Sequence, residues 1–282
     1  MSESDKREFT FRRKDFQYLS GLIYDQTGIV LADHKFDMMY ARLARRLRFL
    51  GLRSVKNYID YFSSPEGVDE LPNLINAMTT NLTRFFRETH HFDTLRDRAL
   101  KPIAANAAKG PKDSVRIWSA GCSSGMEPYS IAMTVAESLP NVSSWDALIL
   151  ATDIDTKMLN HAREGIYPKT DTEEIPAHMR KKYMYRESPD SLRMDRSLRD
   201  MIRFNRLNLL HDWPMKKLFD VIFCRNVLIY FDQQTREKLV SRFVDQLVPG
   251  GYLFLGHSEA LAGEKTSLKN VGRSSFRKVA HV

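Results

Sequence analysis

From Val115 to the end of the chain, short apolar runs alternate with segments typical of helices. Two runs, VRIWSAG and ALILATDID, have the character of buried parallel strands, and a helix follows each of them, beginning near Met126 and near Thr156. FDVIFCRNV, a helix from Asp232 to about Leu247, and PGGYLFLGH continue the pattern. Strands that alternate with helices predict a doubly wound parallel sheet with helices on both faces.

Two other parts of the chain do not follow this alternation. Residues from about Phe11 to Phe86 contain no convincing strand, which predicts an all-helical segment. A polar stretch between the second and third core strands is long for a crossover and contains short alternating runs. We therefore predict a small helical domain over residues 1–80, followed by an α/β domain over residues 81–282 with a small antiparallel β-subdomain inserted at about 168–204.

Composition narrows the class of protein. The 282 residues are 43% hydrophobic and 28% charged, as in ordinary globular proteins. No stretch approaches the ~18 apolar residues that a membrane span needs, and the charged start is not a signal peptide. We therefore expect a cytoplasmic protein without membrane insertion. Cys122 and Cys224 have no partners at zinc-finger spacing, so we expect neither a disulfide framework nor a bound metal.

The segment LADHKFDMMYARLARRLRFLGL carries the clearest helical pattern near the N-terminus. Asp33 is a suitable N-cap and Gly51 a suitable C-terminal stop. Leu43, Leu47 and Leu50 recur at helical spacing and predict one buried stripe.

Most of the arginines of this segment lie off that stripe. Arg42, Arg45, Arg46 and Arg48 are followed by Arg53, with no acidic residue between Asp37 and Asp60. Most charge runs are solvated faces, but those usually mix both signs. The net charge of +8 indicates an acidic partner. Two interpretations stay open here: a solvated face, or a docking surface for such a partner.

The stretch SAGCSSGMEPYS joins the first strand to its helix, where doubly wound sheets bind ligands. It is not G-x-G-x-x-G, and alone it could be a tight turn. However, TDID places Asp153 or Asp155 at the carboxyl end of the second strand, where an acid typically binds ribose hydroxyls. Glu127 at the helix start would repel a phosphate and favour an ammonium group. A nucleoside with an amino group and no phosphate is S-adenosylmethionine, so a methyltransferase is predicted.

Several further motifs carry a resemblance to a known family. TTNLTRFFRETHHF, RLNLL and FCRNVLIYF occur in order with GCSSGMEPYS, TDID and LVPGGYLFLGHSE. Together they resemble the CheR family, the glutamate O-methyltransferases of chemotaxis receptors. The resemblance implies an α/β fold in which a helical domain precedes a class I (Rossmann-like) methyltransferase domain with an inserted β-subdomain. It also implies S-adenosylmethionine as cofactor, S-adenosylhomocysteine as product, and association with membrane receptor arrays.

The same resemblance assigns roles to residues that match the family's motifs. Arg87 and Tyr230 would be catalytic. Glu127 would hold the methionine amino group, Asp153 the ribose hydroxyls, and Asn208 with Leu209 would flank the adenine. The expected cofactor contacts are Asn81, Thr83, Arg87, Ala120, Gly121, Glu127, Asp153, Asn208, Leu209, Arg225 and Asn226.

The implied reaction methylates a glutamate carboxylate, which is already ionised at pH 7 and needs no general base. Arg87 would orient that carboxylate with its guanidinium fork, and His90, His91 and His257 are not required. The implied partner is the cytoplasmic helical domain of chemoreceptors, whose methylation helices carry several glutamates. The docking surface on this interpretation is formed by Arg42, Arg45, Arg46 and Arg53.

Two alternative functions remain open. A class I methyltransferase acting on another substrate, such as RNA, is compatible with the positive charge. However, the chain lacks an aromatic-rich basic module, and CRNV differs from the (N/D)PPY-type motif, so we expect no nucleic acid partner. A non-catalytic cofactor-binding scaffold is disfavoured by the intact NLTRFFR and CRNVLIY motifs.

One receptor-binding mode of the family is not expected. Some members use the β-subdomain to bind a C-terminal receptor pentapeptide through a loop that contains glycine. The corresponding stretch here, YMYRESPDSLRMDRSLRDMIRF, has no glycine and is shorter than that pattern. We therefore expect no tight binding of the pentapeptide.

Overall fold

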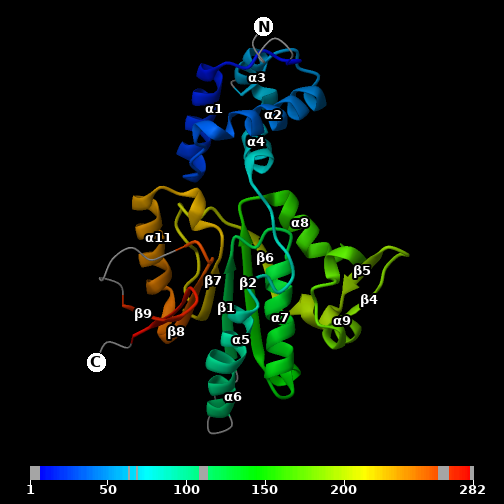
Figure 1. Ribbon diagram of the computed structural model, residues 1–282, viewed down its shortest axis with the longest axis vertical. Coiled ribbons are helices and arrows are strands. Elements are labelled where there is room, and N and C mark those ends of the chain that lie inside the picture. The colour runs from blue at the N-terminus through cyan, green and yellow to red at the C-terminus, as the bar shows by residue number, and fades with distance from the viewer. Residues whose placement is uncertain (1–6, 63, 68, 108–113, 260–266, 280–282) are drawn as a thin grey trace. The chain divides into compact units, whose positions relative to one another are not determined.

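The computed structural model describes residues 7–62, 64–67, 69–107, 114–259 and 267–279; the first residues of the charged start lie outside these ranges. The chain forms two compact units (Figure 1). The first comprises Met1–Thr80 with Tyr230–Asp232, and the second comprises Asn81–Ile229 with Gln233–Val282.

The described part of the first unit is helical. Its elements are α1 (Arg13–Thr27), η2 (Asp33–Lys35), α2 (Phe36–Leu50), α3 (Val55–Tyr61), η3 (Pro65–Gly67) and α4 (Glu70–Met78). Leu43 and Leu47 of α2 are fully buried in a core that they share with α1 and α4, and Leu50 packs at its edge. The predicted stripe is therefore confirmed.

The ends of α2 were predicted with mixed success. Gly51 ends the helix in the left-handed region at φ 68°, as expected for a residue without Cβ. The prediction that Asp33 caps the helix was wrong, because Asp33 opens the 3₁₀ turn η2 and α2 begins only at Phe36. The Asp33 carboxylate instead lies 3.7 Å from the Arg13 guanidinium.

The second unit is built on a seven-stranded sheet in the order β6-β2-β1-β7-β8-β10-β9. Its strands are β1 (Ser114–Ala120), β2 (Asp146–Asp153), β6 (Ile202–Arg206), β7 (Phe219–Cys224), β8 (Leu247–Leu255), β9 (Leu268–Gly272) and β10 (Ser275–Lys278). Neighbours from β6 to β8 run parallel. The predicted parallel arrangement is confirmed for β1, β2, β7 and β8. At one edge the sheet gains two strands that were not predicted, and β10 is antiparallel to both β8 and β9.

Helices cover both faces of this sheet (Figure 1). They are α5 (His90–Thr94), the π-helical η4 (Leu95–Leu100), α6 (Lys101–Ala107), α7 (Met126–Ser138), α8 (Thr156–Glu164) and α11 (Gln233–Asp245), with short turns η5 (Val142–Ser144) and η7 (Leu228–Tyr230). Successive residues of β1 point to opposite faces. Ile117 packs in one core with Ile131 of α7, whereas the Trp118 ring lies 5.2 Å from the Phe243 ring of α11.

The inserted subdomain is a three-stranded antiparallel sheet in the order β3-β5-β4. It comprises β3 (Ile166–Pro168), η6 (Lys169–Thr172), α9 (Ala177–Tyr183), β4 (Met184–Arg186), β5 (Ser191–Met194) and α10 (Arg196–Asp200). The last residues of the predicted insertion belong elsewhere, because β6 pairs in parallel with β2 in the main sheet. None of the helices in the described part of the chain is both long and apolar enough to span a bilayer.

Candidate cofactor site and active site

The glycines of the loop after β1 are required by contacts within the protein itself. Gly121 has φ 81° and Gly125 has φ 90°, a region that L side chains rarely adopt. A Cβ atom on Gly121 would lie 2.3 Å from Cγ2 of Val227, and one on Gly125 would lie 2.7 Å from Cβ of Ala162. The loop therefore fits closely against the turn after β7 and against α8. It lies at the carboxyl ends of the neighbouring strands β1, β2 and β7.

Asp153 ends β2 beside this loop. Its Oδ2 accepts a hydrogen bond from the Ser123 backbone N–H at 2.7 Å, and its Oδ1 accepts one from the Asp155 N–H at 2.9 Å. Burial raises the pKa of Asp153 to about 6, although these backbone donors oppose the shift. The Ile154 backbone N–H also donates to Asp153. Since a carboxylate offers about four acceptor positions, Asp153 keeps capacity for a further donor, such as a ribose hydroxyl.

Asp155, the other acid of TDID, has a structural task. Its Oδ1 caps α8 by accepting from the backbone N–H groups of Lys157 and Met158, at 2.9 and 3.2 Å. Its Oδ2 accepts from Nδ2 of Asn81 at 2.9 Å. Asp155 therefore caps α8 and is only 1% exposed, against 9% for Asp153, which favours Asp153 over Asp155 as the acid that is available to a cofactor.

The NLTRFFR segment is attached to the same edge of the sheet. The Ser123 hydroxyl donates to the Asn81 carbonyl at 3.2 Å, and the Phe86 N–H donates to Oγ of Ser130 on α7 at 3.0 Å. Phe86 and Glu88 have positive φ values of 51° and 57°. Non-glycine residues keep such backbone angles only when their surroundings hold them, so this segment has a defined path past the glycine loop.

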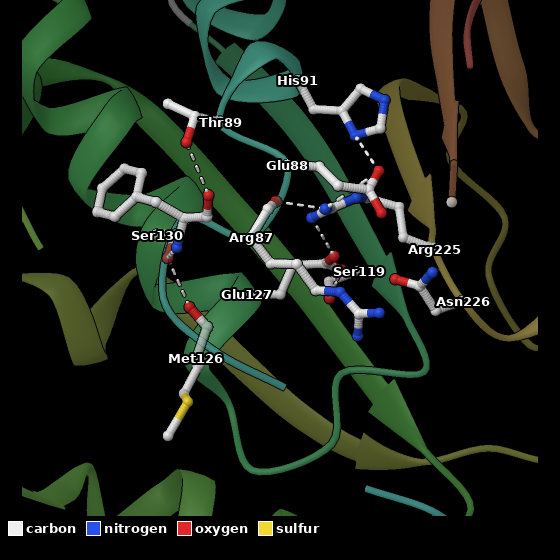
Figure 2. A network of polar contacts seen from close by, with 12 residues as sticks. Arg87, Glu88, Thr89, His91, Ser119, Met126, Glu127, Ser130, Arg225 and Asn226 are labelled. Atoms are coloured by element: carbon white, nitrogen blue, oxygen red, sulfur yellow. Dashed lines mark hydrogen bonds and ion pairs between the residues drawn. The ribbon is translucent and has the colours of Figure 1, made fainter. Parts of the chain in front are cut away.

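A buried ion pair lies at the centre of the site (Figure 2). Oε2 of Glu127 is 3.0 Å from Nη1 of Arg225, and its Oε1 accepts from the Ser119 hydroxyl at 2.8 Å. The Arg225 side chain, only 2% exposed, also donates from Nη2 to the Arg87 carbonyl. Two nitrogens of Arg225 thus have partners, as a buried charge requires, whereas its buried Nε makes no hydrogen bond within the described residues. Burial raises the pKa of Glu127, and the Arg225 charge opposes that shift.

Glu88 and His91 extend this network behind Arg225 (Figure 2). Oε2 of Glu88 lies 3.5 Å from Nη2 of Arg225 and 3.4 Å from Nδ1 of His91. Nε2 of His91 lies 2.9 Å from the Arg273 carbonyl, which can only accept, so this nitrogen carries a proton. Burial, assisted by the Arg225 charge, lowers the pKa of His91 to about 3. His91 is therefore a neutral imidazole whose proton is used within the protein.

The ligand atoms of Glu88, His90 and His91 lie within 4.8 Å of one another, a spacing that could serve a metal ion. However, the Arg225 guanidinium lies 3.5 Å from the Glu88 carboxylate in the same cluster. A fixed positive charge at that distance disfavours a divalent cation.

The remaining expected cofactor residues lie near strand ends of the second unit or in the segment from Asn81 to Arg87. Ala120 is buried at the end of β1, and Leu209 is buried beyond β6. Oδ1 of Asn208 accepts from the Leu210 N–H at 3.0 Å. Asn226 follows Arg225 with φ 57°. Thr83 lies in the segment between Asn81 and Arg87, and Nη1 of Arg87 donates to the Leu82 carbonyl at 2.9 Å. Figure 2 shows the Arg87 guanidinium separate from that of Arg225.

Tyr230 belongs by its contacts to the first unit. Its carbonyl accepts from the Val30 N–H at 2.8 Å, and its hydroxyl is 3.5 Å from the Thr80 carbonyl. The catalytic role of Tyr230 remains a prediction.

The four proposed docking arginines are not equally available. Nη1 of Arg42 donates to the carbonyls of Met78 and Thr79 at the end of α4, each at 2.8 Å. Nε of Arg46 donates at 2.6 Å to Glu70, whose side chain is 3% exposed. The expectation that this whole face is free was therefore wrong for these two arginines, because α4 supplies carbonyls and a carboxylate from outside the basic helix. Arg45 and Arg53 are exposed.

Three residues that shape this site are not among those predicted from the sequence: Ser123, Glu88 and Glu259. Glu259 accepts hydrogen bonds from three backbone N–H groups, including that of Asn226. The signal for Glu259 was present, because it follows β8 in the motif HSE, much as Asp153 ends β2.

A mixed sheet of this strand order, with a close-fitting glycine loop after β1 and an acid at the end of β2, defines a class I S-adenosylmethionine-dependent methyltransferase. The residues fit that cofactor: Asp153 has acceptor capacity for hydroxyl groups, and Glu127 presents a carboxylate at the start of α7.

Comparison with known proteins identifies the family. Residues 14–79 match the all-alpha domain of CheR methyltransferases, and residues 81–276 match their S-adenosylmethionine-binding domain. The chain therefore belongs to the CheR family of chemotaxis methyltransferases. A probable chemotaxis protein methyltransferase of Rhizobium etli is 44% identical over 260 residues, covering 91% of this chain and 96% of that protein. Chemotaxis protein methyltransferase 2 of Pseudomonas aeruginosa is 41% identical, covering 96% and 95%, and the Escherichia coli enzyme is 44% identical, covering 86% and 83%.

Proposed function

We propose that the protein methylates glutamate side chains of chemoreceptors, forming glutamyl methyl esters from carboxylates and S-adenosylmethionine. The observation that carries this proposal is the match of residues 81–276 to the S-adenosylmethionine-binding domain of CheR methyltransferases, together with chemotaxis methyltransferases 41–44% identical over most of the chain. In the site itself, Nε2 of His91 is directed to the Arg273 carbonyl. An alcohol or ammonium substrate would need a base, whereas a glutamate carboxylate with a pKa of about 4.3 is already a nucleophile at pH 7.

The proposed cofactor contacts follow from the same geometry. Asp153 would accept from the ribose hydroxyls, and Glu127 would share its charge between Arg225 and the amino group of the methionine part. Asn208 and Leu209 would flank the adenine, and Asn81, Thr83 and Asn226 would lie along the cofactor. The bound sulfonium supplies an activated methyl group and leaves as a neutral thioether. The protein's task is then alignment, which can contribute about 7–11 kcal/mol in well-oriented reactions.

Arg87 is the proposed orienting residue for the substrate carboxylate. Its backbone is held by Arg225, and its guanidinium can grip both carboxylate oxygens at once. Arg87→Ala should reduce kcat by more than it weakens cofactor binding. Arg87→Lys should recover little activity, because an ammonium group cannot form the two parallel hydrogen bonds.

The test incubates the enzyme with a receptor cytoplasmic fragment and labelled cofactor, and measures base-labile methanol from the product. Arg84→Lys is the matched control, because Arg84 lies in the same segment but pairs with Glu174 at 2.9 Å. Near-normal turnover of Arg87→Lys would show that Arg87 supplies only charge. A methyl label that stays on the receptor fragment after base treatment would refute glutamate methylation, and so would a label found in RNA instead. Cofactor binding without any turnover would indicate a non-catalytic scaffold.

We also propose that the exposed arginines of α2 and of the turn after it dock the acidic methylation helices of the receptor. The support is the exposure of Arg45 and Arg53, since Arg42 and Arg46 are used within the first unit. Exposed ion pairs contribute only ~0.2–1 kcal/mol each and are screened by salt. Arg45→Glu/Arg53→Glu should therefore raise the receptor KM several-fold at low salt and much less at high salt.

Cofactor affinity of this double variant should stay unchanged. Arg196→Glu is the control, because Arg196 is 84% exposed and lies on the second unit. An unchanged receptor KM at low salt would assign these arginines to a solvated face.

A further inference from the structure

Glu259 has an unusual environment for a carboxylate. It follows β8, is only 6% exposed, and lies among backbone rather than side-chain donors. Its Oε2 accepts from the N–H groups of Gly256 at 2.6 Å and Asn226 at 2.9 Å, and its Oε1 accepts from that of Ile229 at 3.2 Å. Among the ion pairs formed within the described residues, none includes Glu259. Three oriented backbone dipoles therefore solvate this buried charge.

These hydrogen bonds join two loops that are distant in the sequence. Asn226 and Ile229 belong to the turn after β7, whereas Gly256 and Glu259 follow β8. The loops are also in close contact. A Cβ atom on Gly256 would lie 2.5 Å from Nδ2 of Asn226 and 2.8 Å from Oε2 of Glu259.

The hydrogen bond from Asn226 to Glu259 stabilises the backbone conformation of Asn226. Its φ of 57° lies in the left-handed region, which few non-glycine residues adopt, although asparagine does so more often than most. Residues in this region persist when their surroundings hold them. The Asn226 N–H is bonded directly to Glu259, and the preceding residue is Arg225, which pairs with Glu127. The carboxylate thus fixes the turn at the point where two proposed cofactor contacts leave the sheet.

We propose that Glu259 is a positioning residue for methyl transfer, which acts by holding Asn226 in the left-handed turn that directs its side chain toward the cofactor. The inference rests on the proposed assignment of Asn226 as a cofactor contact. It predicts that loss of the Glu259 carboxylate weakens cofactor binding without changing the affinity for the receptor.

The first experiment measures cofactor affinity by calorimetry on the full chain, without receptor, for Glu259→Gln and Glu259→Asp. Glutamine has one acceptor oxygen in place of two, and aspartate keeps the charge but is too short to reach all three N–H groups. We expect the dissociation constant to rise about tenfold for Glu259→Gln and less for Glu259→Asp. Glu237→Gln is the matched control, because Glu237 is exposed on α11 and accepts a hydrogen bond from the Gln233 side chain.

The second experiment separates positioning from a general structural role by a double-mutant cycle with Asn226→Ala. If Glu259 acts through Asn226, then adding Glu259→Gln to Asn226→Ala should weaken cofactor binding by less than about twofold further. A full additional loss would overturn the proposal, as would wild-type affinity in both Glu259 variants. If Glu259→Gln does not fold, the cycle is run with Glu259→Asp.

A change in the receptor KM equal to the change in cofactor affinity would also overturn the proposal. Failure of the proposed substrate leaves this test intact, because the calorimetry uses cofactor alone. Wild-type affinity of Asn226→Ala would instead remove Asn226 from the cofactor contacts, and with it this role for Glu259.

Discussion

Replacing Arg46 by methionine should unfold the helical unit at a lower temperature rather than impair receptor docking. Arg46 donates at 2.6 Å to Oε1 of Glu70, and the Tyr58 hydroxyl donates to the same oxygen at 2.7 Å. The Glu70 and Arg46 side chains are 3% and 13% exposed. Burial raises the pKa of Tyr58, assisted by its hydrogen bond to Glu70, so the phenol stays a neutral donor.

The magnitude follows from leaving the Glu70 carboxylate buried without its cation. Removing one partner of a buried ion pair typically costs about 3–5 kcal/mol. The Tyr58 hydrogen bond remains, so we expect a value near the lower limit. For a domain of this size, about 3 kcal/mol corresponds to a fall of roughly 12–24 °C in the unfolding midpoint.

The distribution of tryptophan allows the two units to be measured separately. The three tryptophans are Trp118, Trp145 and Trp213, all in the second unit. Their fluorescence therefore follows that unit, whereas far-ultraviolet circular dichroism follows the helices of both. Arg46→Met should shift a dichroism transition much more than the fluorescence transition.

Two controls make this result specific. Arg45→Met removes an exposed arginine from the same helix and should have little effect on stability. Arg46→Met/Glu70→Gln removes both charges but keeps an acceptor for Tyr58, so it should recover much of the loss. Equal melting of Arg46→Met and Arg45→Met would refute the reasoning and return Arg46 to the docking surface.

Four further outcomes are expected. Asp153→Ala should raise the cofactor dissociation constant by about tenfold or more, as measured by calorimetry. The folded pKa of Asp153 is raised to about 6. Its contribution to folding stability is therefore complete below about pH 4 and is lost as the pH rises through 6. Cofactor affinity should change in the opposite direction and fall as the pH drops below 6, because a protonated Asp153 is a weaker acceptor; measuring the wild-type affinity against pH would check this. Gly125→Ala should destabilise the second unit by about 1–3 kcal/mol, because φ is 90° and the new methyl group would lie 2.7 Å from Cβ of Ala162. Urea unfolding followed by tryptophan fluorescence measures this change. Unchanged stability would show that the loop relaxes. An isolated receptor C-terminal pentapeptide should not bind tightly to the β-subdomain in calorimetry, and a micromolar dissociation constant would contradict this.

Local patterns were sufficient for much of the fold. The apolar runs that became β1, β2, β7 and β8, and the helices after them, could be located because burial and periodicity are properties of neighbouring residues. Gly51 could be identified as a helix stop for the same reason, since the left-handed conformation is a local requirement. The motif residues Asp153, Glu127 and Arg225 could be selected because they follow strands or begin a helix at the edge of the sheet where ligands bind.

Pairing between distant segments was decided only in the tertiary structure. β6 has the polar sequence IRFNR, and the predicted insertion includes its first residues, but its backbone completes the edge of the main sheet beside β2. β9 and β10 run antiparallel at the opposite edge, where no local signal gives strand direction.

The same holds for charges. The sequence predicts that Arg46 lies on a free basic face, because no acidic residue occurs between Asp37 and Asp60. In the structure, however, Arg46 donates to Glu70 of another helix. Glu259 was unassigned because its three donors come from the turn after β7 and from Gly256. The sequence by itself determined which segments are buried and which residues stand at strand ends. Only the tertiary structure decided which groups meet, because hydrogen bonds and ion pairs depend on distances in space that a one-dimensional pattern does not contain.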